Sequence, residues 1–416
     1  KSSRPVSGPR EIIKTGIYLV HYSRIVRLLR TKKPALIHLV LVTVSLISLL
    51  IWVGLIFFRG SFWRADQRLC KAGELERWPS IVAVIPARNE VDTIGRTVGS
   101  LLAQNYAGKI RVIVVDDNSD DGTVEAAGNN TDLRIIDGKP LQTGWTGKLW
   151  AVHQGLLEID QFAPNADYVL LTDADIEHHS DNLSELAYKA ITDNQHLVSL
   201  MVKLRCVSIW EKLLIPAFVY FFQKLYPFPN VNNPNNSMAA AAGGCMLIKL
   251  ETLRLAGGIQ PIKDRLIDDC AMGALIKQKG SIWLGLSEQT ISLRSYKHLS
   301  EIWHMVARTA FVQLDHSILN LLGTVLAMVL IYLVPPVLFV FGLITNDLIL
   351  LGSTFGAYLI MVFLYRPTLV LYGMGSLKAP LLPLAGVFYT LMTVSSAFRH
   401  WRGQGGAWKG RSYSKS

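Results

Sequence analysis

Long apolar runs near both ends of this 416-residue chain constrain its fold more than any other feature. Ala35–Phe58 holds one potentially charged residue, His38, and Ile318–Ile344 holds none. A helix of about 20 residues spans the roughly 30 Å hydrocarbon core of a bilayer. We therefore expect a transmembrane helix over residues 35–58. A buried core helix is the alternative, but the length and apolarity of the run argue against it.

Three apolar stretches follow the middle of the chain, at Ile318–Ile344, Leu348–Tyr365 and Ala379–Phe398. Pro335 and Pro336 fall inside the first stretch, and prolines also lie in the last. Because a proline removes a backbone donor and kinks a helix, we predict two or three transmembrane or re-entrant helices over residues 318–398. A basic tail follows at 399–416.

The formal net charge of +11 indicates an anionic partner. Basic residues gather beside the apolar runs, in a predicted N-terminal tail at 1–34 and after residue 398. This placement favours anionic lipid headgroups over nucleic acid. The four cysteines are scattered and form no Cys-x-x-Cys pair, so we expect neither a zinc site nor a disulfide framework.

Residues 80–302 have a different pattern, in which short apolar runs alternate with helical ones. Ile81–Ile85 and Val112–Val115 are predicted strands on either side of a helix over Thr93–Leu102, and Tyr168–Leu171 is a further strand. Strand, helix and strand at this spacing indicate an α/β fold with a mostly parallel, Rossmann-like sheet.

The segment at residues 210–228 carries many aromatic residues but is short for a span and contains prolines. We favour an interfacial helix that docks the domain on a membrane. A buried core helix is the alternative.

Two carboxylates follow the apolar run that ends at Thr172. Asp173 and Asp175 stand at alternate positions, and in extended backbone positions i and i+2 point to the same face. Both could then reach one cation, and carboxylate oxygens suit Mg²⁺ or Mn²⁺. The alternative is a pair of solvated carboxylates at a strand end.

Three further polar positions follow apolar runs. Pro86–Glu90 ends the first predicted strand, and open α/β sheets bind ligands at such carboxyl edges. Asp117 follows the second strand, where it could accept a hydrogen bond from a nucleobase or a ribose hydroxyl. Lys148 lies beside Gly147 and could contact a diphosphate as a point charge. A capped turn or a surface lysine would explain each of them without a ligand.

Asp268 and Asp269 lie at the start of a helix predicted to run through Ile276. Adjacent carboxylates can take separate roles, one structural and one as a general base. The alternative is negative charge that is favoured at a helix N-terminus by the helix dipole.

The order of these motifs resembles the family 2 glycosyltransferases over roughly residues 80–302. The matching segments are Val-Ile-Pro-Ala-Arg-Asn-Glu, Val-Val-Asp-Asp-Asn-Ser-Asp-Asp-Gly-Thr, Thr-Asp-Ala-Asp and Asp-Asp. With Trp-Thr-Gly-Lys at 145–148 and apolar ends, the chain is most similar to the hopene-associated glycosyltransferases. Ceramide glucosyltransferases are related members.

The resemblance implies a GT-A fold and inverting, metal-dependent transfer of a sugar from a nucleotide sugar, expected to be a UDP-sugar, to a lipid acceptor that is hopanoid-related. It implies Mg²⁺ or Mn²⁺ as the cofactor. The implied site residues are Asp269 as the catalytic base, Asp175 as the metal ligand, and Pro86, Arg88, Glu90, Asp117, Lys148 and Asp173 around the nucleotide sugar.

One motif of this family is incomplete. Many lipid-directed and processive members carry Gln-x-x-Arg-Trp before their membrane segments, whereas here Arg308 keeps only the Arg and Gln313 only the Gln. Either is a candidate, together with Asp268, for gating the acceptor or the diphosphate. The missing Trp argues against a processive polymer synthase.

Two alternatives remain open at this point. A polyprenyl-phosphate sugar synthase would use an acceptor that is already an anion and needs no general base. A membrane scaffold with an inactive transferase domain would need no chemistry.

Sugar nucleotides are made in the cytosol, so we expect an integral protein of a bacterial cytoplasmic membrane with its domain facing the cytoplasm. The basic residues around the first span lean slightly the other way.

Overall fold

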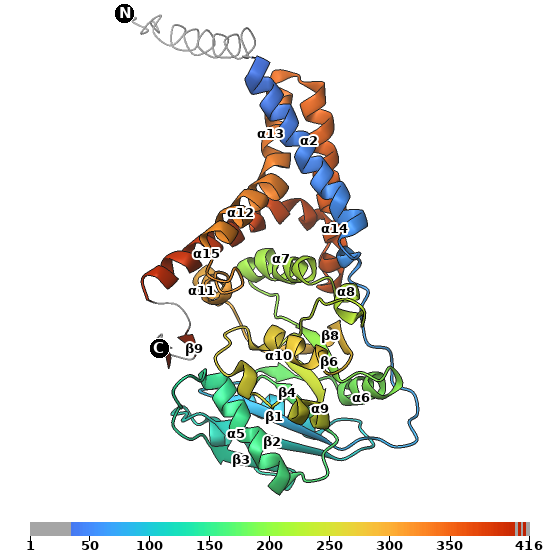
Figure 1. Ribbon diagram of the computed structural model, residues 1–416, viewed down its shortest axis with the longest axis vertical. Helices are drawn as coiled ribbons and strands as arrows, with labels where there is room; N and C mark the ends of the chain where they lie inside the picture. The colour runs from blue at the N-terminus through green and yellow to red at the C-terminus, as the bar shows by residue number, and fades with distance from the viewer. Residues whose placement is uncertain (1–34, 404–406, 409–410, 413–416) are drawn as a thin grey trace, which may run out of the picture. The chain divides into compact units, whose positions relative to one another are not determined.

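The computed structural model describes residues 35–403, 407–408 and 411–412, so the predicted basic tail at 1–34 lies outside the described residues. The chain divides into two compact units (Figure 1). The larger unit comprises Gly54–Leu326 and the described residues from Val362 onward. The smaller unit combines residues 35–53 with Ala327–Met361.

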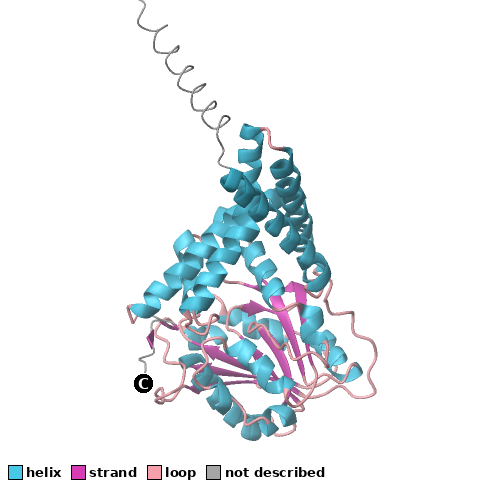
Figure 2. Ribbon diagram, turned by 45° about the horizontal axis from the view of Figure 1, so that its top comes forward, coloured by secondary structure: helices cyan, strands magenta, loops and turns pink. Residues whose placement is uncertain are grey.

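The larger unit is built on a sheet whose strands are magenta in Figure 2. It has eight strands, in the order β3-β2-β1-β4-β7-β6-β8-β5. The strands are β1 (Ile81–Ala87), β2 (Ile110–Asp116), β3 (Leu133–Asp137), β4 (Tyr168–Thr172), β5 (Ile176–Glu177), β6 (Leu197–Lys203), β7 (Cys245–Lys249) and β8 (Ile282–Ser292). The half formed by β3, β2, β1 and β4 is parallel. β7 runs antiparallel to both β4 and β6. The predicted α/β, Rossmann-like sheet is confirmed, with mixed pairing beyond β4.

Helices pack on this sheet and extend the unit. They are α3 (Ile94–Leu102), α4 (Thr123–Ala127), α5 (Gly147–Phe162), α6 (Asn182–Thr192), α7 (Ile209–Leu225), α8 (Phe228–Asn232), α9 (Leu250–Leu255), α10 (Asp268–Lys277), α11 (Leu299–Thr309), α12 (Ile318–Met328) and α15 (Leu382–Trp401). α3 is a typical amphipathic helix, because its apolar residues Ile94, Val98 and Leu101 share one face and are all buried.

A glycine sets the height of α5 above the sheet. A Cβ atom on Gly155 would lie 2.5 Å from Cγ1 of Val84 and 3.0 Å from Cγ2 of Val115. Only a residue without a side chain therefore lets α5 pack this closely on β1 and β2. The first turn of α5, which carries Lys148, is held beside the carboxyl ends of these strands as a result.

The register between β4 and β7 brings two loops together. Thr172 pairs with Cys245, and the Thr172 hydroxyl donates a hydrogen bond to the carbonyl of Gly244 at 2.7 Å. Asp173, just after β4, and Gly243, just before β7, therefore meet at the same edge of the sheet.

Glu211 anchors the segment that follows β8. Its side chain is buried, with 1% exposure, and accepts hydrogen bonds from the backbone N–H groups of Val207 at 2.8 Å and Ser208 at 2.7 Å. Its second oxygen accepts one from the N–H of Tyr296 at 2.7 Å. The Ser208 hydroxyl donates to the carbonyl of Tyr296 at 2.9 Å. The start of α7 thus fixes the segment around Tyr296.

Much of α7 is buried inside the larger unit. Leu214, Ile215 and Tyr220 are each 0% exposed, and the Tyr389 hydroxyl of α15 donates a hydrogen bond to the Leu214 carbonyl at 2.9 Å. This burial favours the alternative of a core helix. The interfacial role of residues 210–228 stays a prediction.

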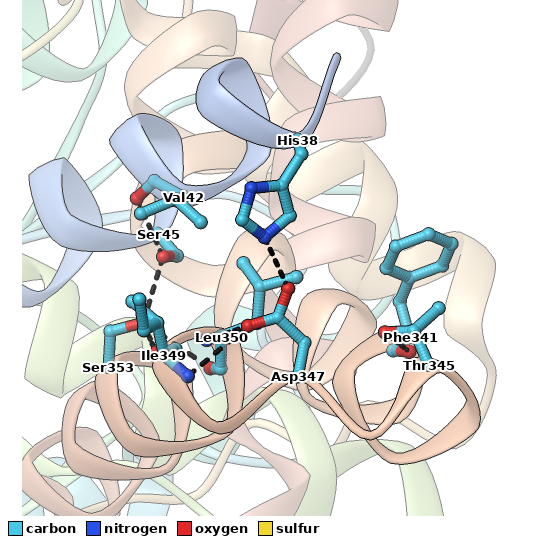
Figure 3. Close-up of polar contacts among 9 residues, drawn as sticks. All are labelled: His38, Val42, Ser45, Phe341, Thr345, Asp347, Ile349, Leu350 and Ser353. Carbon is cyan, nitrogen blue, oxygen red and sulfur yellow. Dashed lines mark hydrogen bonds and ion pairs between the residues drawn. The ribbon is translucent and has the colours of Figure 1, made fainter. Parts of the chain in front are cut away.

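The smaller unit contains most of α2 (Ala35–Phe58), the π-helical segment η3 (Val329–Leu333), α13 (Val334–Thr345) and the first half of α14 (Leu348–Leu371). Figure 3 shows His38 of α2 pointing at Asp347, with Nε2 and Oδ2 2.6 Å apart. The hydroxyls of Ser45 on α2 and Ser353 on α14 are 2.8 Å apart. These contacts satisfy polar groups between otherwise apolar helices.

The prolines in the first C-terminal run interrupt the helix, as predicted. Pro335 and Pro336 have no N–H to offer the carbonyls one turn earlier, and the π-helical segment lies there. Side chains of α2 supply the missing donors. The Ser48 hydroxyl bonds the Leu330 carbonyl at 2.7 Å, and the Trp52 indole N–H bonds the Ile331 carbonyl at 2.9 Å.

Four helices in the described part of the chain are long and apolar enough to cross a membrane: Leu36–Phe58, Ile318–Thr345, Leu348–Leu371 and Ser376–Trp401. They indicate membrane association. The first coincides with the run predicted at residues 35–58, and the other three fall within the predicted C-terminal group. Beyond residue 403 only two short paired strands are described, β9 (Ala407–Trp408) and β10 (Arg411–Ser412).

Replacing Glu211 by Gln should lower the free energy of unfolding by about 1–3 kcal/mol, because an amide nitrogen would face backbone donors that now bond a carboxylate. Thermal unfolding of the detergent-purified chain, followed by tryptophan fluorescence, measures the change. Glu251→Gln is the matched control, since its carboxylate is exposed and pairs with Lys249 at the surface, so we expect a shift within about 0.5 kcal/mol.

The effect of Glu211→Gln should depend on pH. Backbone N–H donors hold the pKa of Glu211 below its ordinary value, although burial alone would raise it. A lowered pKa in the folded state stabilises the fold above the unfolded pKa of about 4.3 and loses that contribution as pH falls. The difference between wild type and variant should therefore shrink on acidification. A difference that stays constant from pH 7 to pH 3.5 would contradict this role.

Candidate active site

A cavity of about 580 Å³ lies where β1 and β4 end and where α5 and α10 begin. Its lining is strongly charged. The cationic side chains are those of Lys148, Arg265, Arg294, Arg308 and Arg399, and the carboxylates are those of Glu90, Asp173, Asp175, Asp268 and Glu301. Charges of both signs at the carboxyl edge of a parallel sheet are typical of a site for a small charged ligand.

Lys148 joins two of the predicted acidic motifs. Its Nζ lies 2.9 Å from Oδ1 of Asp173 and 3.0 Å from Oδ2 of Asp268. Burial alone would lower the pKa of Lys148, but these carboxylates raise it above its ordinary value. The ammonium group is therefore a permanent cation at physiological pH, held between β4 and α10.

Asp173 and Asp175 lie in a turn rather than on a strand. β4 ends at Thr172, and β5 begins at Ile176. The expectation that extended backbone points both carboxylates to one face is therefore wrong. Asp173 pairs with Lys148, whereas Oδ2 of Asp175 lies 3.7 Å from Nη1 of Arg294.

The turn between β4 and β5 is fixed through its backbone. The carbonyl of Asp175 accepts a hydrogen bond from the N–H of Leu293 at 2.7 Å, and that of Ala174 accepts one from the Thr97 hydroxyl at 2.9 Å. The side chains of Asp173 and Asp175 both line the cavity. The backbone contacts thus hold both side chains at the cavity wall, where they pair with Lys148 and Arg294.

The predicted divalent metal fits this pair only with help from a ligand. No group of three His, Cys, Asp or Glu side chains gathers as a metal site among the residues that the structure describes. Mg²⁺ is commonly held by one or two carboxylates together with substrate phosphates and waters. Asp173 and Asp175 match that donor set, and the role of Asp175 as metal ligand stays a prediction.

The two carboxylates at the start of α10 differ in their surroundings. Asp268 lines the cavity, whereas the carboxylate of Asp269 accepts hydrogen bonds from the N–H groups of Gly243 at 3.0 Å and Cys270 at 2.7 Å. Burial raises the pKa of Asp269 to about 6, and the charge of Asp268 adds to that shift. A pKa near neutrality suits a general base.

The loop after β1 is divided between the cavity and the protein interior. Pro86 and Glu90 line the cavity. Arg88 turns away, and its Nη1 donates a hydrogen bond to the backbone carbonyl of Asp117 at 2.5 Å and lies 3.6 Å from the carboxylate of that residue. Neither Arg88 nor Asp117 lines the cavity, so their predicted contact with a nucleotide remains a prediction.

The two candidates for the incomplete motif are in different places. Arg308 lines the cavity, whereas the Gln313 side chain donates a hydrogen bond to the Tyr226 hydroxyl at 2.8 Å and does not reach the cavity. The structure therefore gathers Pro86, Glu90, Lys148, Asp173, Asp175, Asp268 and Arg308 at the cavity, whereas Arg88, Asp117, Asp269 and Gln313 do not line it.

Sequence reasoning missed several lining residues. Arg294 and Tyr296 follow β8, Glu301 and His304 belong to α11, and Arg399 comes from the last turn of α15. Arg399 is a basic residue at the end of a long apolar helix. This pattern could have pointed to a site residue, but it equally fits the basic tail predicted at residues 399–416. The segment around Arg294 has no pattern that would single it out.

Comparison with known proteins identifies one domain. Residues 82–254 match the model of Glycosyl transferase family 2. No curated protein sequence matches the chain.

Several solved structures are similar to parts of this chain. A mannosyltransferase from Pyrobaculum calidifontis, in complex with GDP-Man and Mn²⁺, is 17% identical, with 86% of this chain and 99% of that one covered, at a TM-score of 0.48. A glucosyl-3-phosphoglycerate synthase from Mycobacterium tuberculosis is 20% identical over 57% of this chain and 79% of that one, at 0.37. TarS from S. aureus is 14% identical over 56% and 40%, at 0.38. These scores lie below 0.5, so the likeness assigns no activity or ligand.

Replacing Lys148 by Met should destabilise the fold by about 1–3 kcal/mol, because Asp173 and Asp268 would lose the cation that separates their charges. Thermal unfolding at pH 7.5 measures this. Lys109→Met, which removes an exposed lysine away from the cavity, is the control and should stay within about 0.5 kcal/mol of wild type. Equal stability of the two variants would show that the Lys148 cluster contributes nothing to the fold.

Proposed function

We propose that the protein is a family 2 glycosyltransferase, whose model residues 82–254 match, and that it transfers a sugar from a nucleotide sugar to a lipid acceptor with inversion at the anomeric carbon. The observation that carries this proposal is the position of Lys148. It links Asp173 with Asp268 in a charged cavity at the carboxyl edge of the sheet.

The donor's diphosphate is the group that these charges suit best. α5 begins at the cavity, where Thr146 and Lys148 are lining residues, so the positive end of the helix dipole lies beside the ammonium group of Lys148. Both stabilise negative charge that grows on a leaving diphosphate. A divalent cation bound at Asp173 and Asp175 would add further positive charge to the same group. In this proposal Asp117 recognises the base, which we expect to be uracil.

Two adjacent carboxylates compete for the role of general base. Asp269 holds the position that the family resemblance implies, and its pKa of about 6 leaves it deprotonated at neutral pH. Its backbone hydrogen bonds fix the carboxylate but also occupy part of its acceptor capacity. Asp268 lines the cavity, but its carboxylate is engaged by the ammonium group of Lys148. We therefore propose Asp269 as the base and Asp268 as the residue that positions Lys148.

A lipid acceptor is supported by the apolar helices. Four of them are long enough to cross a membrane, and α15, which forms most of the last one, also contributes Arg399 to the cavity wall. The assignment to hopanoid-related lipids, the use of UDP, and the cytoplasmic orientation rest on the resemblance of the sequence motifs. They are part of this proposal.

Replacing Asp269 by Asn should lower the transfer rate by on the order of 10²-fold or more, as expected for loss of a general base. Binding of the nucleotide, measured by calorimetry with UDP and Mn²⁺, should remain close to wild type. Asp264→Asn is the control, because that carboxylate is exposed and lies outside the cavity.

Replacing Asp268 by Asn separates the two roles. If Asp268 positions Lys148, this variant should weaken UDP binding while it retains measurable transfer. Full loss of transfer in Asp268→Asn with normal turnover in Asp269→Asn would assign the base to Asp268 instead.

The transfer rate should fall on acidification with a midpoint near pH 6, where Asp269 becomes protonated. In Asp268→Asn the midpoint should move to lower pH, since a neighbouring negative charge that raises the pKa of Asp269 is removed and Lys148 remains. The measurement is the pH profile of kcat/KM for the residual activity. A midpoint that is unchanged in Asp268→Asn would contradict Asp269 as the titrating base.

A further inference from the structure

Two arginines that line the cavity differ from its other cations. Lys148 and Arg294 pair with carboxylates of the cavity, and Arg265 pairs with Asp264. Arg308 and Arg399 pair with no carboxylate in the part of the chain that the structure describes. This part of the cavity therefore carries two positive charges that the protein does not itself neutralise.

The helices that carry these arginines are held against each other. The indole N–H of Trp303 on α11 donates a hydrogen bond to the Ser395 hydroxyl of α15 at 3.0 Å. The backbone N–H of Phe311, just after α11, bonds the Ser396 hydroxyl at 3.0 Å, and Phe311 packs in a buried cluster with Ala397. The two arginines are thus presented from fixed helix backbones rather than from loops.

The remaining charged groups on α11 do not neutralise the pair. Glu301 faces the cavity from the first turn of α11, where its carboxylate accepts a hydrogen bond from the backbone N–H of His298 at 3.1 Å. His304 is engaged with the carbonyl of Ser300 at 2.5 Å. Both are committed to their own helix, which leaves the guanidinium groups for a ligand.

We propose that Arg308 and Arg399 bind a phosphate group, at a position separate from the cluster of Lys148, Asp173 and Asp268. Guanidinium groups match phosphate oxygens through paired N–H donors, and two of them on one phosphate give a strong, oriented contact. The inference rests on the proposed glycosyl transfer, which supplies two sources for the group: a phosphorylated lipid acceptor or the diphosphate of the donor.

The location of Arg399 favours the acceptor as the source. This residue lies in the last turn of α15, a helix long and apolar enough to cross a membrane. The end of such a helix lies at the level of lipid headgroups. A lipid phosphate at that level would meet Arg399 without leaving its bilayer.

With a phosphorylated acceptor the attacking atom would be a phosphate oxygen, so the general-base role proposed above for Asp269 applies only to a hydroxyl acceptor, and Asp269→Asn would keep its transfer rate with a phosphorylated one. An oxygen of its phosphate monoester would form the new bond to the anomeric carbon, while the bond from that carbon to the donor's diphosphate breaks. The nucleoside diphosphate leaves with the bonding electron pair. No proton needs to be removed, because the attacking oxygen is already anionic.

The test uses the full chain in detergent with Arg399→Gln, Arg308→Gln and the control Arg402→Gln, which removes an arginine three residues further on that does not line the cavity. Binding of undecaprenyl phosphate, of unphosphorylated undecaprenol, and of UDP with Mn²⁺ is measured for each. We expect Arg399→Gln to weaken undecaprenyl phosphate binding by about tenfold, a change of about 1.4 kcal/mol, and to leave undecaprenol and UDP unchanged.

The other outcomes have distinct meanings. Weaker UDP binding with unchanged lipid binding would support the phosphate site but assign it to the donor. Variants that bind all three ligands as the Arg402→Gln control does would overturn the site. If wild type binds undecaprenyl phosphate through Arg399 but neither binds UDP nor transfers sugar, the phosphate site stands and the proposed transfer fails.

Discussion

The ion cluster around Lys148 is the constraint on which the site depends. Three segments far apart in sequence reach it: the first turn of α5, the turn after β4 and the first turn of α10. Each carries charge that would be costly to bury alone. Because Gly155 lets α5 lie close to β1 and β2, and the pairing of β4 with β7 sets the height of the β4 turn, the fold brings these charges into one place. The same cluster fixes the geometry in which a diphosphate would be held.

The cavity separates its charges by function. At the sheet edge, cations and carboxylates alternate and neutralise one another, which suits a ligand that arrives with its own counterion. At the helix pair, Arg308 and Arg399 add positive charge without carboxylate partners among the described residues. A ligand that bridges both regions needs anionic groups at each. In the proposed reaction a sugar nucleotide would occupy the first region, so the second would bind the other substrate.

Local patterns made some elements predictable, and tertiary contacts hid others. β1 is apolar along its length because both faces are covered, and α3 buries residues one and two turns apart, so period alone located them. α2 begins and ends where its apolar run does.

The turn that holds Asp173 and Asp175 could not be predicted from an apolar pattern in this way. Apolar residues stand on both sides of the turn, before Thr172 and at Ile176, so the pattern suggests one continuous strand. The strand ends at Thr172 because β4 pairs with β7 whereas β5 pairs with β8. Arg399 was hidden for a related reason, since only the packing of α15 on α11 directs it to the cavity.

The apolar helices follow the rule that backbone polar groups in hydrocarbon need internal partners. Pro335 and Pro336 break that rule locally, and the side chains of Ser48 and Trp52 restore it from α2. In the larger unit the hydroxyl of Ser395 accepts a hydrogen bond from α11, and that of Ser396 accepts one from Phe311, two residues after α11. These serines explain how an apolar helix can also form a wall of a charged cavity. Its polar positions turn toward the domain, while exposed residues such as Leu384 and Leu391 turn outward. The proposed transfer at the Arg399 end of this helix would then take place where a lipid and a water-soluble nucleotide can both be present.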